Sequence, residues 1–413
     1  MIVSTILSAI VQAAPAPQAF DPVEATNAYL ATISSVARAR SDAYFEGGYW
    51  LILWNALVSV GVAWGLLQAG VVSRLSERAT AWTKGRKAGR AFIFACLYLA
   101  LTGVVTLPWS IYVGWLREHQ YGMSNQTLPA WLGEWLIGTA IGTILGGLAL
   151  LGLLTLYRKL TRSWWAWGTL ASGFFLLVGL LLGPVFIEPL FNRYTPMPAS
   201  PLRAQILQMA QANGVPTSNV LVVDASRQTK RISANVAGVG PTVRVALNDN
   251  LLNRTSPPEV RAVMGHELGH YVLGHTASLL IGFTLIAGLF LLVLDHATPW
   301  LVGRYGSRWH ISGRDDPAML VPATIVASLL AVLLTPVTNS LIRFHETQAD
   351  YFGINTSRAP DGWARVALRL GEYRKLEPSR LEEIVFFDHP SGRTRILMSM
   401  QWKAHHLGEP DLQ

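Results

Sequence analysis

The sequence predicts a mainly α-helical membrane protein in which a polar α+β domain is split around the last two of about six transmembrane helices. Of the 413 residues, 51% are hydrophobic and only 14% are charged, against roughly 25% charged in soluble domains. Six apolar runs reach the length of about 20 residues that a helix needs to cross a bilayer. Two polar regions, 191–275 and 342–413, lie outside these runs.

The six apolar runs have the composition and the flanking residues that are typical of membrane-spanning helices. Their interiors contain few ionised groups, and aromatic residues gather at several margins, as at Tyr49, Trp50 and Trp164. Such amphipathic rings suit the headgroup level of a bilayer, which favours spans over the buried core helices of a large soluble protein. The predicted spans are 48–70, 91–116, 132–157, 166–190, 276–296 and 317–341.

The N-terminus carries a shorter apolar stretch, MIVSTILSAIVQA at residues 1–13, followed by APAPQA. An apolar stretch before small residues is typical of a signal peptide, although no Lys or Arg precedes it here. We expect either a cleaved signal or a short retained helix, which would be a seventh span. The single cysteine, Cys96, excludes an internal disulfide.

The net charge of +8 comes largely from three basic loops and not from a surface that would bind nucleic acid. No basic stripe interleaved with aromatic residues is present, so no nucleic-acid partner is expected. Twelve Lys and Arg residues concentrate in loops on one side of the predicted topology, 71–90, 158–163 and 297–316, against three in the opposite segments 14–47 and 117–131. The positive-inside rule places the basic loops in the cytoplasm and the two polar regions on the non-cytoplasmic side.

The first polar region has an α+β pattern. Residues 201–215 predict an amphipathic helix that ends at Asn-Gly. Two short strands are expected at NVLVVD (219–224) and TVRVALN (242–248). Between them, RISANVAGVG (231–240) predicts an extended segment at a sheet edge.

A capped helix follows at residues 256–275, with Ser256 as N-cap and prolines in its first turn. His266 and His270 are four residues apart, so both imidazoles project from one face and can bind one ion. Glu267 lies between them. This HExxH pattern is typical of zincins, in which the histidines bind Zn²⁺ and the glutamate acts as general base and then as general acid. The simpler interpretation is a solvated helix face that happens to carry histidines.

Catalytic zinc sites usually have a third protein ligand and one open position. RFHETQAD (343–350) continues the last span in helical phase and places Glu346 and Asp350 on one face. Glu346 is expected to be the third ligand, with His345 as its competitor, and Asp350 to accept the free ring N–H of a ligating histidine. Three further glutamates are expected to be solvated helix charges: Glu372, Glu382 and Glu383.

A last polar motif, FFDHPSGRTRI, contains His389, Arg393 and Arg395. A histidine and an arginine near a zinc site can stabilise an oxyanion or hold a peptide carboxylate. From spacing alone the functional signal is weak, because a His-Pro turn with nearby arginines is more often structural.

The ordered motifs HELGHYVLGH, ETQAD and HPSGRTRI, with two spans between the first two, resemble those of the integral-membrane zinc metalloproteases of the CAAX prenyl protease type 1 family. The resemblance covers about residues 20 to 400. It implies one Zn²⁺ per chain with the ligands His266, His270 and Glu346, Glu267 as the catalytic glutamate, and Asp350 behind a ligand. It also implies that His389 and Arg395 act near the substrate, and that the helices enclose an intramembrane chamber with the zinc near its rim.

Two local features refine the resemblance. His275 matches a histidine of the CAAX-type branch that the related HtpX-type proteases usually lack. SANVAGVG occupies the place of the family's substrate-pairing strand, so the predicted substrate contacts are Ala234, Asn235 and Val236. Ser233 stands where an Asn is common in the family, yet an extended peptide can still pair with the backbone.

The sequence therefore predicts a zinc-dependent membrane endopeptidase acting on a peptide or protein that is prenylated or membrane-associated. The eukaryotic members of the family have seven spans and a catalytic region facing the cytosol, unlike the topology expected here. The alternatives are an HtpX-like quality-control protease and a transporter or channel whose structural metal has a fourth ligand, His275 or His389. The expected regions are 1–47, an N-terminal segment and linker; 48–190, four spans; 191–275 and 342–413, the two halves of the metalloprotease domain; and 276–341, two further spans.

Overall fold

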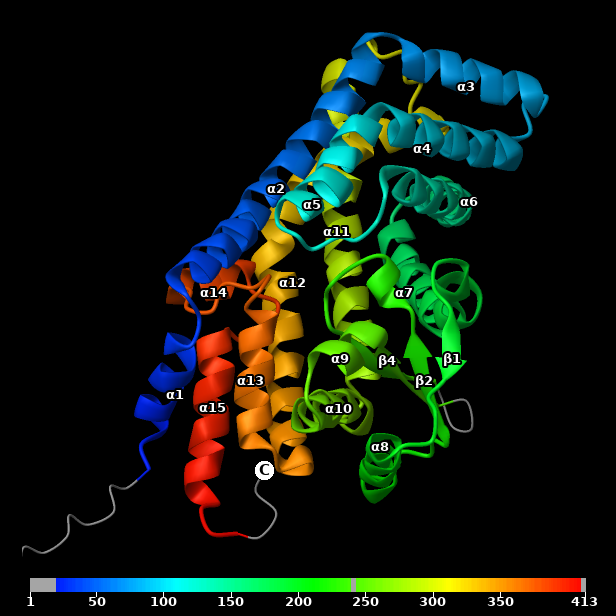
Figure 1. Ribbon diagram of the computed structural model, residues 1–413. Helices are drawn as coiled ribbons and strands as arrows, with labels where there is room; N and C mark the ends of the chain where they lie inside the picture. Colours follow the sequence, from blue (N-terminus) through cyan, green and yellow to red (C-terminus); the bar gives the residue numbers. More distant parts are fainter. Residues whose placement is uncertain (1–19, 239–242, 410–413) are drawn as a thin grey trace, which may run out of the picture.

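The computed structural model describes residues 20–238 and 243–409. The signal-like stretch 1–13 lies outside the described residues. The described chain is mainly helical, with a bundle of long helices at one end and a smaller α+β domain at the other (Figure 1). This arrangement confirms the predicted fold class.

Six helices in the described part of the chain are long and apolar enough to cross a membrane, as predicted. Several extend beyond the predicted runs because polar turns continue the helix, as α12 does into the α+β domain and α11 does at the opposite end of the bundle. They are α2 (Ser35–Gln68), α4 (Lys87–Ile111) continued through a π-helical turn (Tyr112–Leu116) into α5 (Arg117–Gln120), α6 (Leu128–Lys159), α7 (Trp164–Leu182), α11 (His275–Tyr305) and α12 (Leu320–Ser357).

The three basic loops meet at the end of the bundle away from the sheet, where α3 (Val71–Trp82) lies (Figure 1). Lys87 Nζ lies 3.1 Å from Asp315 Oδ2, and Arg90 Nη2 lies 3.1 Å from Asp316 Oδ1. Arg158 donates to the carbonyl of Asp315. These contacts join the segments 71–90, 158–163 and 297–316 into one surface, which we call the basic end.

The α+β domain contains a four-stranded sheet in the order β1-β2-β4-β3. The predicted strands are present, and the extended segment lies at the edge as expected. β1, which pairs antiparallel with β2, was not predicted because it has only three residues. The strands are β1 (Tyr194–Pro196), β2 (Asn219–Val223), β3 (Ala234–Ala237) and β4 (Arg244–Asn248).

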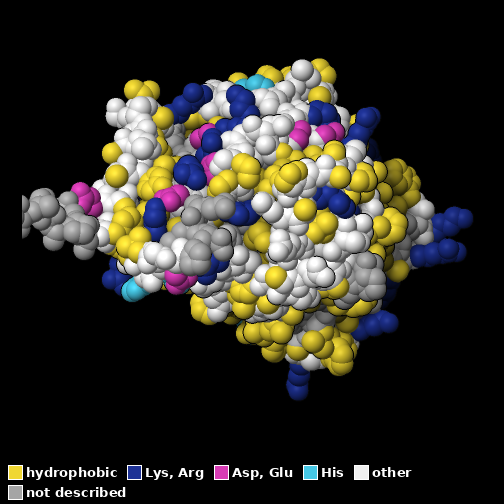
Figure 2. All heavy atoms as spheres, turned by 60° about the horizontal axis from the view of Figure 1, so that its bottom comes forward, with side chains coloured by type: hydrophobic (Ala, Val, Ile, Leu, Met, Phe, Trp, Pro, Cys, Tyr) yellow, Lys and Arg dark blue, Asp and Glu magenta, His cyan; other side chains and the backbone are white. Residues whose placement is uncertain are grey.

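The two halves of the domain share one core. Leu247 of β4, Met264 of the HExxH helix, Ile354 of α12 and Trp363 belong to one buried cluster. Figure 2 views this end obliquely, with Lys, Arg, Asp and Glu side chains interspersed on its surface. The helices of the domain are α8 (Pro201–Ala212), α9 (Asp249–Arg254), α10 (Pro257–Val272), α13 (Pro360–Leu370), α14 (Arg380–Phe386) and α15 (Gly392–His405), and α1 (Pro22–Ala31) packs against α15.

Candidate metal centre

The site forms where α10 meets the last turns of α12, and small residues bring the two backbones together. A Cβ on Gly265 would lie 2.6 Å from the carbonyl oxygen of Gly353, and one on Gly353 would lie 2.6 Å from the amide nitrogen of His266. One turn further on, Gly269 faces the backbone of Ala349. The helices can approach this closely only because these positions lack larger side chains.

Three potential ligand atoms converge from the two helices. His266 Nε2 lies 3.2 Å from Glu346 Oε2, His270 Nε2 lies 3.3 Å from Glu346 Oε1, and the two Nε2 atoms are 3.1 Å apart. Ligands about 2.1 Å from a tetrahedral Zn²⁺ are separated by roughly 3.4 Å. The spacing and the N, N, O donor set therefore fit a zinc ion, and the three residues form the one group within 4.8 Å that could hold a metal among the described residues.

Buried partners orient the two imidazoles. His266 Nδ1 lies 2.8 Å from Asp350 Oδ1, and Asp350 Oδ2 accepts from Arg395 Nε at 2.8 Å. Asp350 is 1% exposed, so its charge is shared by these two partners. When the Nδ1 of His266 carries the proton donated to Asp350, its Nε2 lone pair is left for a cation. Burial lowers the pKa of His266, but its contacts with Asp350 and Glu346 outweigh burial and raise this pKa to about 10.

His270 is oriented by a different chain of contacts. Its Nδ1 lies 2.9 Å from His275 Nδ1, and His275 Nε2 lies 3.1 Å from Gln348 Oε1. His275 therefore faces the outer nitrogen of His270 rather than the space between the ligand atoms.

The start of α10 is held by a buried carboxylate. The backbone N–H and the hydroxyl of Ser256 donate to Glu259 Oε2 at 2.8 and 2.6 Å. Glu259 Oε1 accepts from Arg369 Nε of α13 at 2.5 Å. The predicted N-cap thus belongs to a contact that also fixes α10 against α13.

Glu267 faces a pocket of about 190 Å³ beside the ligand atoms. His266, Glu267, His389 and Arg395 line it together with Ala234 of β3. Burial raises the pKa of Glu267. The carboxylate is therefore a stronger base than an exposed glutamate and stands where a substrate would enter.

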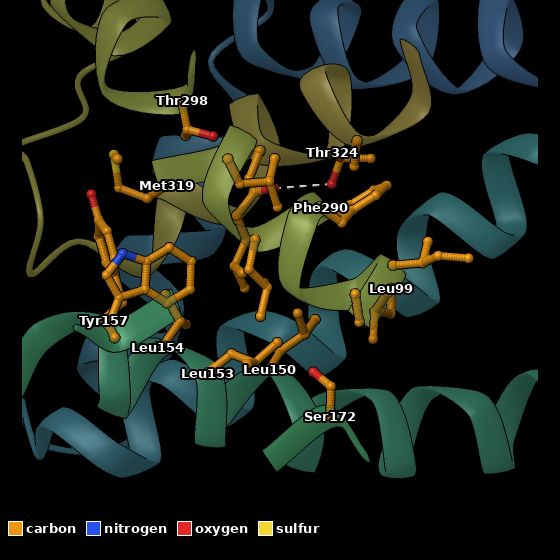
Figure 3. Close-up of a pocket in the computed structure, with 18 of the residues that line it drawn as sticks. Leu99, Leu150, Leu153, Leu154, Tyr157, Ser172, Phe290, Thr298, Met319 and Thr324 are labelled. Carbon is orange, nitrogen blue, oxygen red and sulfur yellow. Dashed lines mark hydrogen bonds between the residues drawn. The ribbon is translucent and has the colours of Figure 1, made fainter. Parts of the chain in front are cut away.

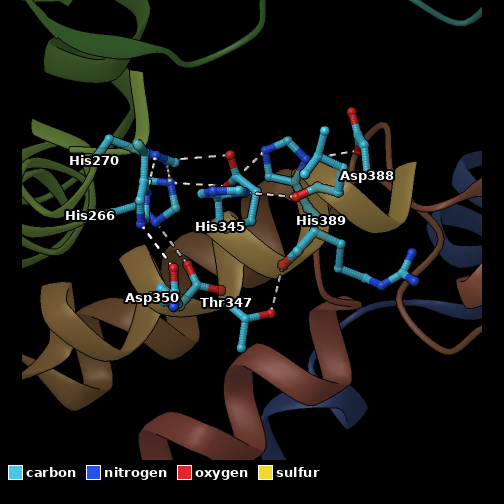
Figure 4. Close-up of polar contacts among 12 residues, drawn as sticks. His266, His270, His345, Thr347, Asp350, Asp388 and His389 are labelled. Atoms are coloured by element: carbon cyan, nitrogen blue, oxygen red, sulfur yellow. Dashed lines mark hydrogen bonds and ion pairs between the residues drawn. The ribbon is translucent and has the colours of Figure 1, made fainter. Parts of the chain in front are cut away.

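His389 and Arg395 approach the site from the last segment of the chain. His389 Nε2 lies 3.0 Å from Glu346 Oε2 and its Nδ1 lies 2.8 Å from Asp388 Oδ1. Arg395 Nη2 lies 3.4 Å from Glu346 Oε2. Figure 4 shows His389 facing His266 and His270, with Asp350 behind His266.

The other residues considered from the sequence lie elsewhere. His345 Nε2 lies 2.7 Å from Ser278 Oγ, and its Nδ1 donates to the carbonyl of Leu341, so its ring is directed away from the three ligand atoms. Arg393 pairs with Glu377. The three remaining glutamates have partners outside the site: Glu372 with Arg254, Glu382 with Lys375, and Glu383 with the backbone N–H of Ser391.

The edge strand β3 presents backbone groups beside the pocket. Ala234 and Val236 are paired in register with Leu247 and Val245 of β4, and the carbonyl of Ser233 accepts from the N–H of Asn248. Because hydrogen bonding alternates along an antiparallel ladder, the N–H and C=O groups of Ala234 and Val236 point to the free edge. The Asn235 backbone faces β4.

Two of the pocket residues that carry polar groups, Tyr373 and Arg374, were not predicted from the sequence. Tyr373 and Arg374 line the same pocket as Glu267, and Arg374 Nη2 lies 3.5 Å from His389 Nε2. Burial lowers the pKa of Arg374. Their segment, GEYRKLEPS, follows α13 and carries no motif, so only its position next to HPSGRTRI could have suggested a role.

Sequence comparisons agree with this geometry. Residues 196–400 match the profile of peptidase family M48, and residues 25–193 match the profile described as CAAX prenyl protease N-terminal, five membrane helices. The chain is 29% identical over 351 residues to the uncharacterized metalloprotease YhfN of Bacillus subtilis, covering 83% of this chain and 82% of that protein.

Eukaryotic relatives match over a shorter part of their length. The CAAX prenyl protease 1 homolog of Arabidopsis thaliana is 30% identical over 275 residues, 63% of each protein. The CAAX prenyl protease 1 of Saccharomyces cerevisiae is 27% identical over 278 residues, 64% of this chain and 61% of the relative. The match thus spans less than two thirds of these two relatives.

A solved structure shares the fold. The crystal structure of S. mikatae Ste24p superposes with a TM-score of 0.75 at 19% identity, covering 92% of this chain and 95% of that chain. Six apolar helices, the two adjoining profiles and this fold lead to one assignment. Residues 196–400 belong to peptidase family M48, and the chain is a membrane-embedded metallopeptidase with the N-terminal membrane region of the CAAX prenyl proteases.

Proposed function

We propose that this protein is a zinc endopeptidase in which one Zn²⁺ per chain is held by His266, His270 and Glu346. The observation that carries the proposal is the convergence of two Nε2 atoms and a carboxylate at 3.1–3.3 Å, beside a pocket that leaves room for water and substrate. A zinc ion bound there would polarise a peptide carbonyl and acidify a water molecule.

Glu267 is the proposed general base and acid. Its carboxylate would accept a proton from a water molecule in the pocket and then deliver that proton to the departing amine. The raised pKa of Glu267 suits both steps, because a group that titrates nearer neutrality accepts and returns a proton more readily.

The neighbouring residues are proposed to position these groups and the substrate. Asp350 would hold His266 in the tautomer with its Nδ1 protonated. His389 and Arg395 would donate to the oxygen that becomes negative during attack, or to a substrate carboxylate. Since both lie within 3.4 Å of Glu346 Oε2, small rotations of their side chains direct donors into the pocket.

The proposed substrate is an extended peptide, prenylated or otherwise membrane-associated, that pairs with the free edge of β3. The outward N–H and C=O groups of Ala234 and Val236 provide a template for such pairing. The relatives named CAAX prenyl protease 1 support a lipid-modified substrate.

The catalytic region is proposed to be non-cytoplasmic, because the basic end lies at the opposite end of the bundle and basic loops favour the cytoplasm.

The test is cleavage by the purified, zinc-loaded protein of a farnesylated CAAX peptide, the same peptide without the lipid, and an unfolded membrane protein. Faster cleavage of the farnesylated peptide supports the proposal. A preference for the unfolded protein would favour the HtpX-like quality-control alternative. A metal with four protein ligands, including His275 or His389, and no cleavage would favour a transporter with a structural metal.

A further inference from the structure

A second cavity lies among the membrane helices and has no part in the proposed reaction. It has a volume of about 540 Å³ and is lined by residues of α4, α6, α7, α11 and α12. Its lining is almost entirely apolar, with leucines such as Leu99, Leu150 and Leu153 (Figure 3). Tyr98 of α4 hydrogen-bonds to Thr324 of α12 across one side.

The cavity has the length of one leaflet and begins at the basic end. Along α7 it extends from Trp164, the first residue of the helix, to Leu176. Twelve residues of helix span about 18 Å, which is close to half of the hydrocarbon thickness of about 30 Å. The space therefore has the dimensions of a lipid acyl chain in the leaflet at the basic end.

The end of the cavity nearest the loops carries unsatisfied polar groups. Thr298 of α11 is 5% exposed and lines the cavity, and its hydroxyl has no hydrogen-bond partner in the part of the chain that the structure describes. Pro299 is the next residue, and because proline has no N–H, the carbonyl of Asp295 loses its helical donor. Figure 3 places Thr298 at the same end as Met319 and Tyr157, away from Leu99 and Ser172. A free hydroxyl at the end of an apolar cavity suits the glycerol region of a lipid, and the Asp295 carbonyl lies about one helical turn before it on α11.

Positive charge stands above this polar rim. The Arg314 guanidinium lies 3.9 Å from the ring centroid of Tyr157, a cavity residue, and its hydrogen bonds go to the carbonyls of Tyr157 and Thr161. Arg158 likewise donates to the carbonyls of Lys87 and Asp315. Among the described residues neither guanidinium is in an ion pair within 4 Å, although the carboxylates of Asp295 and Asp315 lie nearby. Both charges can therefore attract a lipid phosphate.

We propose that this cavity is a binding site for an anionic phospholipid, with one acyl chain among the leucines, the glycerol region at Thr298 and the phosphate near Arg158 and Arg314. The other acyl chain remains in the bilayer. Charge complementarity favours this occupant, because the loops 71–90, 158–163 and 297–316 contain twelve Lys and Arg but only three Asp and Glu.

The site is separate from the peptidase centre. The lining of the cavity on α12 ends at Ala327, nineteen residues before Glu346, which corresponds to about 28 Å of helix. A lipid tail on a substrate held at the metal centre would have to cross nearly the whole bilayer to reach it. The proposal is therefore independent of the peptidase function.

The experiment uses the full-length protein, delipidated in detergent and mixed with phosphatidylglycerol or phosphatidylcholine, with retained lipid counted by native mass spectrometry. We expect one phosphatidylglycerol per chain, retained about tenfold more than phosphatidylcholine. Ala323→Phe fills the cavity and should abolish retention. The matched control is Ala331→Phe, at an exposed position two turns along α12 that does not line the cavity, and it should retain the lipid.

Two further variants keep the test decisive if Ala323→Phe does not fold. Ala287→Phe fills the same cavity from α11. Arg158→Gln with Arg314→Gln should remove the preference for phosphatidylglycerol, whereas Arg158→Lys should keep it. Equal retention by the wild-type protein and the filled variants, or no difference between the two lipids in the wild-type protein, would overturn the proposal.

Discussion

Gly265 of α10 and Gly353 of α12 are in backbone contact, so close that a Cβ on the first would lie 2.6 Å from the carbonyl oxygen of the second. His266 follows Gly265 directly, and Glu346 lies two helical turns before Gly353. The contact therefore sets the distance between the imidazole and carboxylate donors. A metal centre at this position therefore requires the close packing of α10 on α12 in addition to the HExxH motif.

Gly265→Ala should force the two helices apart and reduce zinc binding by at least about tenfold, since positioning defects around metal ligands typically have effects of this size. Zinc content after dialysis, measured by mass spectrometry, tests this. Gly133→Ala is the control, because a Cβ there meets no atom of another described segment within 4 Å. Equal zinc content in both variants would show that the close contact does not position the ligands.

Glu267→Gln should retain zinc and lose activity by about 10²- to 10⁴-fold, the range expected for loss of a general acid–base group. His266→Ala should lose both zinc and activity. Peptide cleavage and metal content are measured on the same preparations, with Glu77→Gln at the basic end as a control. Full activity in Glu267→Gln would refute the role assigned to this carboxylate.

Asp350→Asn should weaken zinc binding by about 10- to 100-fold, because an amide holds the His266 imidazole less firmly than a carboxylate. The buried Arg395 would also lose one of its two charged partners and keep only Glu346, so a lower melting temperature is expected. A zinc titration with a competing chelator gives the affinity. If affinity is unchanged while activity falls, Asp350 acts on the substrate and not through His266.

Val236→Pro should raise KM for a peptide substrate by roughly tenfold, the effect of losing one well-made hydrogen bond to the substrate. The N–H of Val236 points to the free edge of β3, and proline is tolerated where a strand's N–H faces away from its partner. Asn235→Ala, which alters only a side chain, is the matched control. An unchanged KM would indicate that the peptide does not pair with this edge.

The contact between Glu259 and Arg369 predicts a dependence of stability on pH. Burial raises the pKa of Glu259, but its hydrogen bonds with Arg369 and Ser256 outweigh burial and hold the pKa below its usual value. A depressed pKa contributes stability above the unfolded pKa, and this contribution disappears as the pH falls through the folded pKa. Glu259→Gln should therefore lower the free energy of unfolding at pH 7 by about 2 kcal/mol, which is seen as a lower melting temperature. At pH 3 the variant and the wild-type protein should differ much less. A difference independent of pH would contradict this explanation.

The spans were predictable because hydropathy alone defines them, and the strands because alternating apolar residues are bounded by turns. The HExxH helix was also predictable, since Ser256 and the following prolines mark its start. β1 was not, because Tyr194–Pro196 gains its strand conformation only by pairing with β2. The residues around Tyr194–Pro196 do not reveal that β2 is available to pair with this segment.

The candidate site was predictable where spacing along one helix determines geometry, as for His266 and His270 or Glu346 and Asp350. Spacing could not decide between His345 and Glu346, which are adjacent but point to different faces of α12. The contact of His345 with Ser278 of α11 depends on tertiary packing. Arg374 could not be found for the same reason: it joins the pocket through the fold of the segment after α13.

α12 carries Val321 and Pro322 near the basic end and Glu346 at the metal centre on one uninterrupted helix of 38 residues. No loop separates its membrane portion from its ligand-bearing portion. A bilayer thinner or thicker than the span changes the tilt of such a helix, and here a change of tilt moves the carboxylate relative to the histidines of α10. We therefore expect bilayer thickness to alter the distance between the Glu346 carboxylate and the two imidazoles wherever the tilt of α12 exceeds what its contact with α10 can follow.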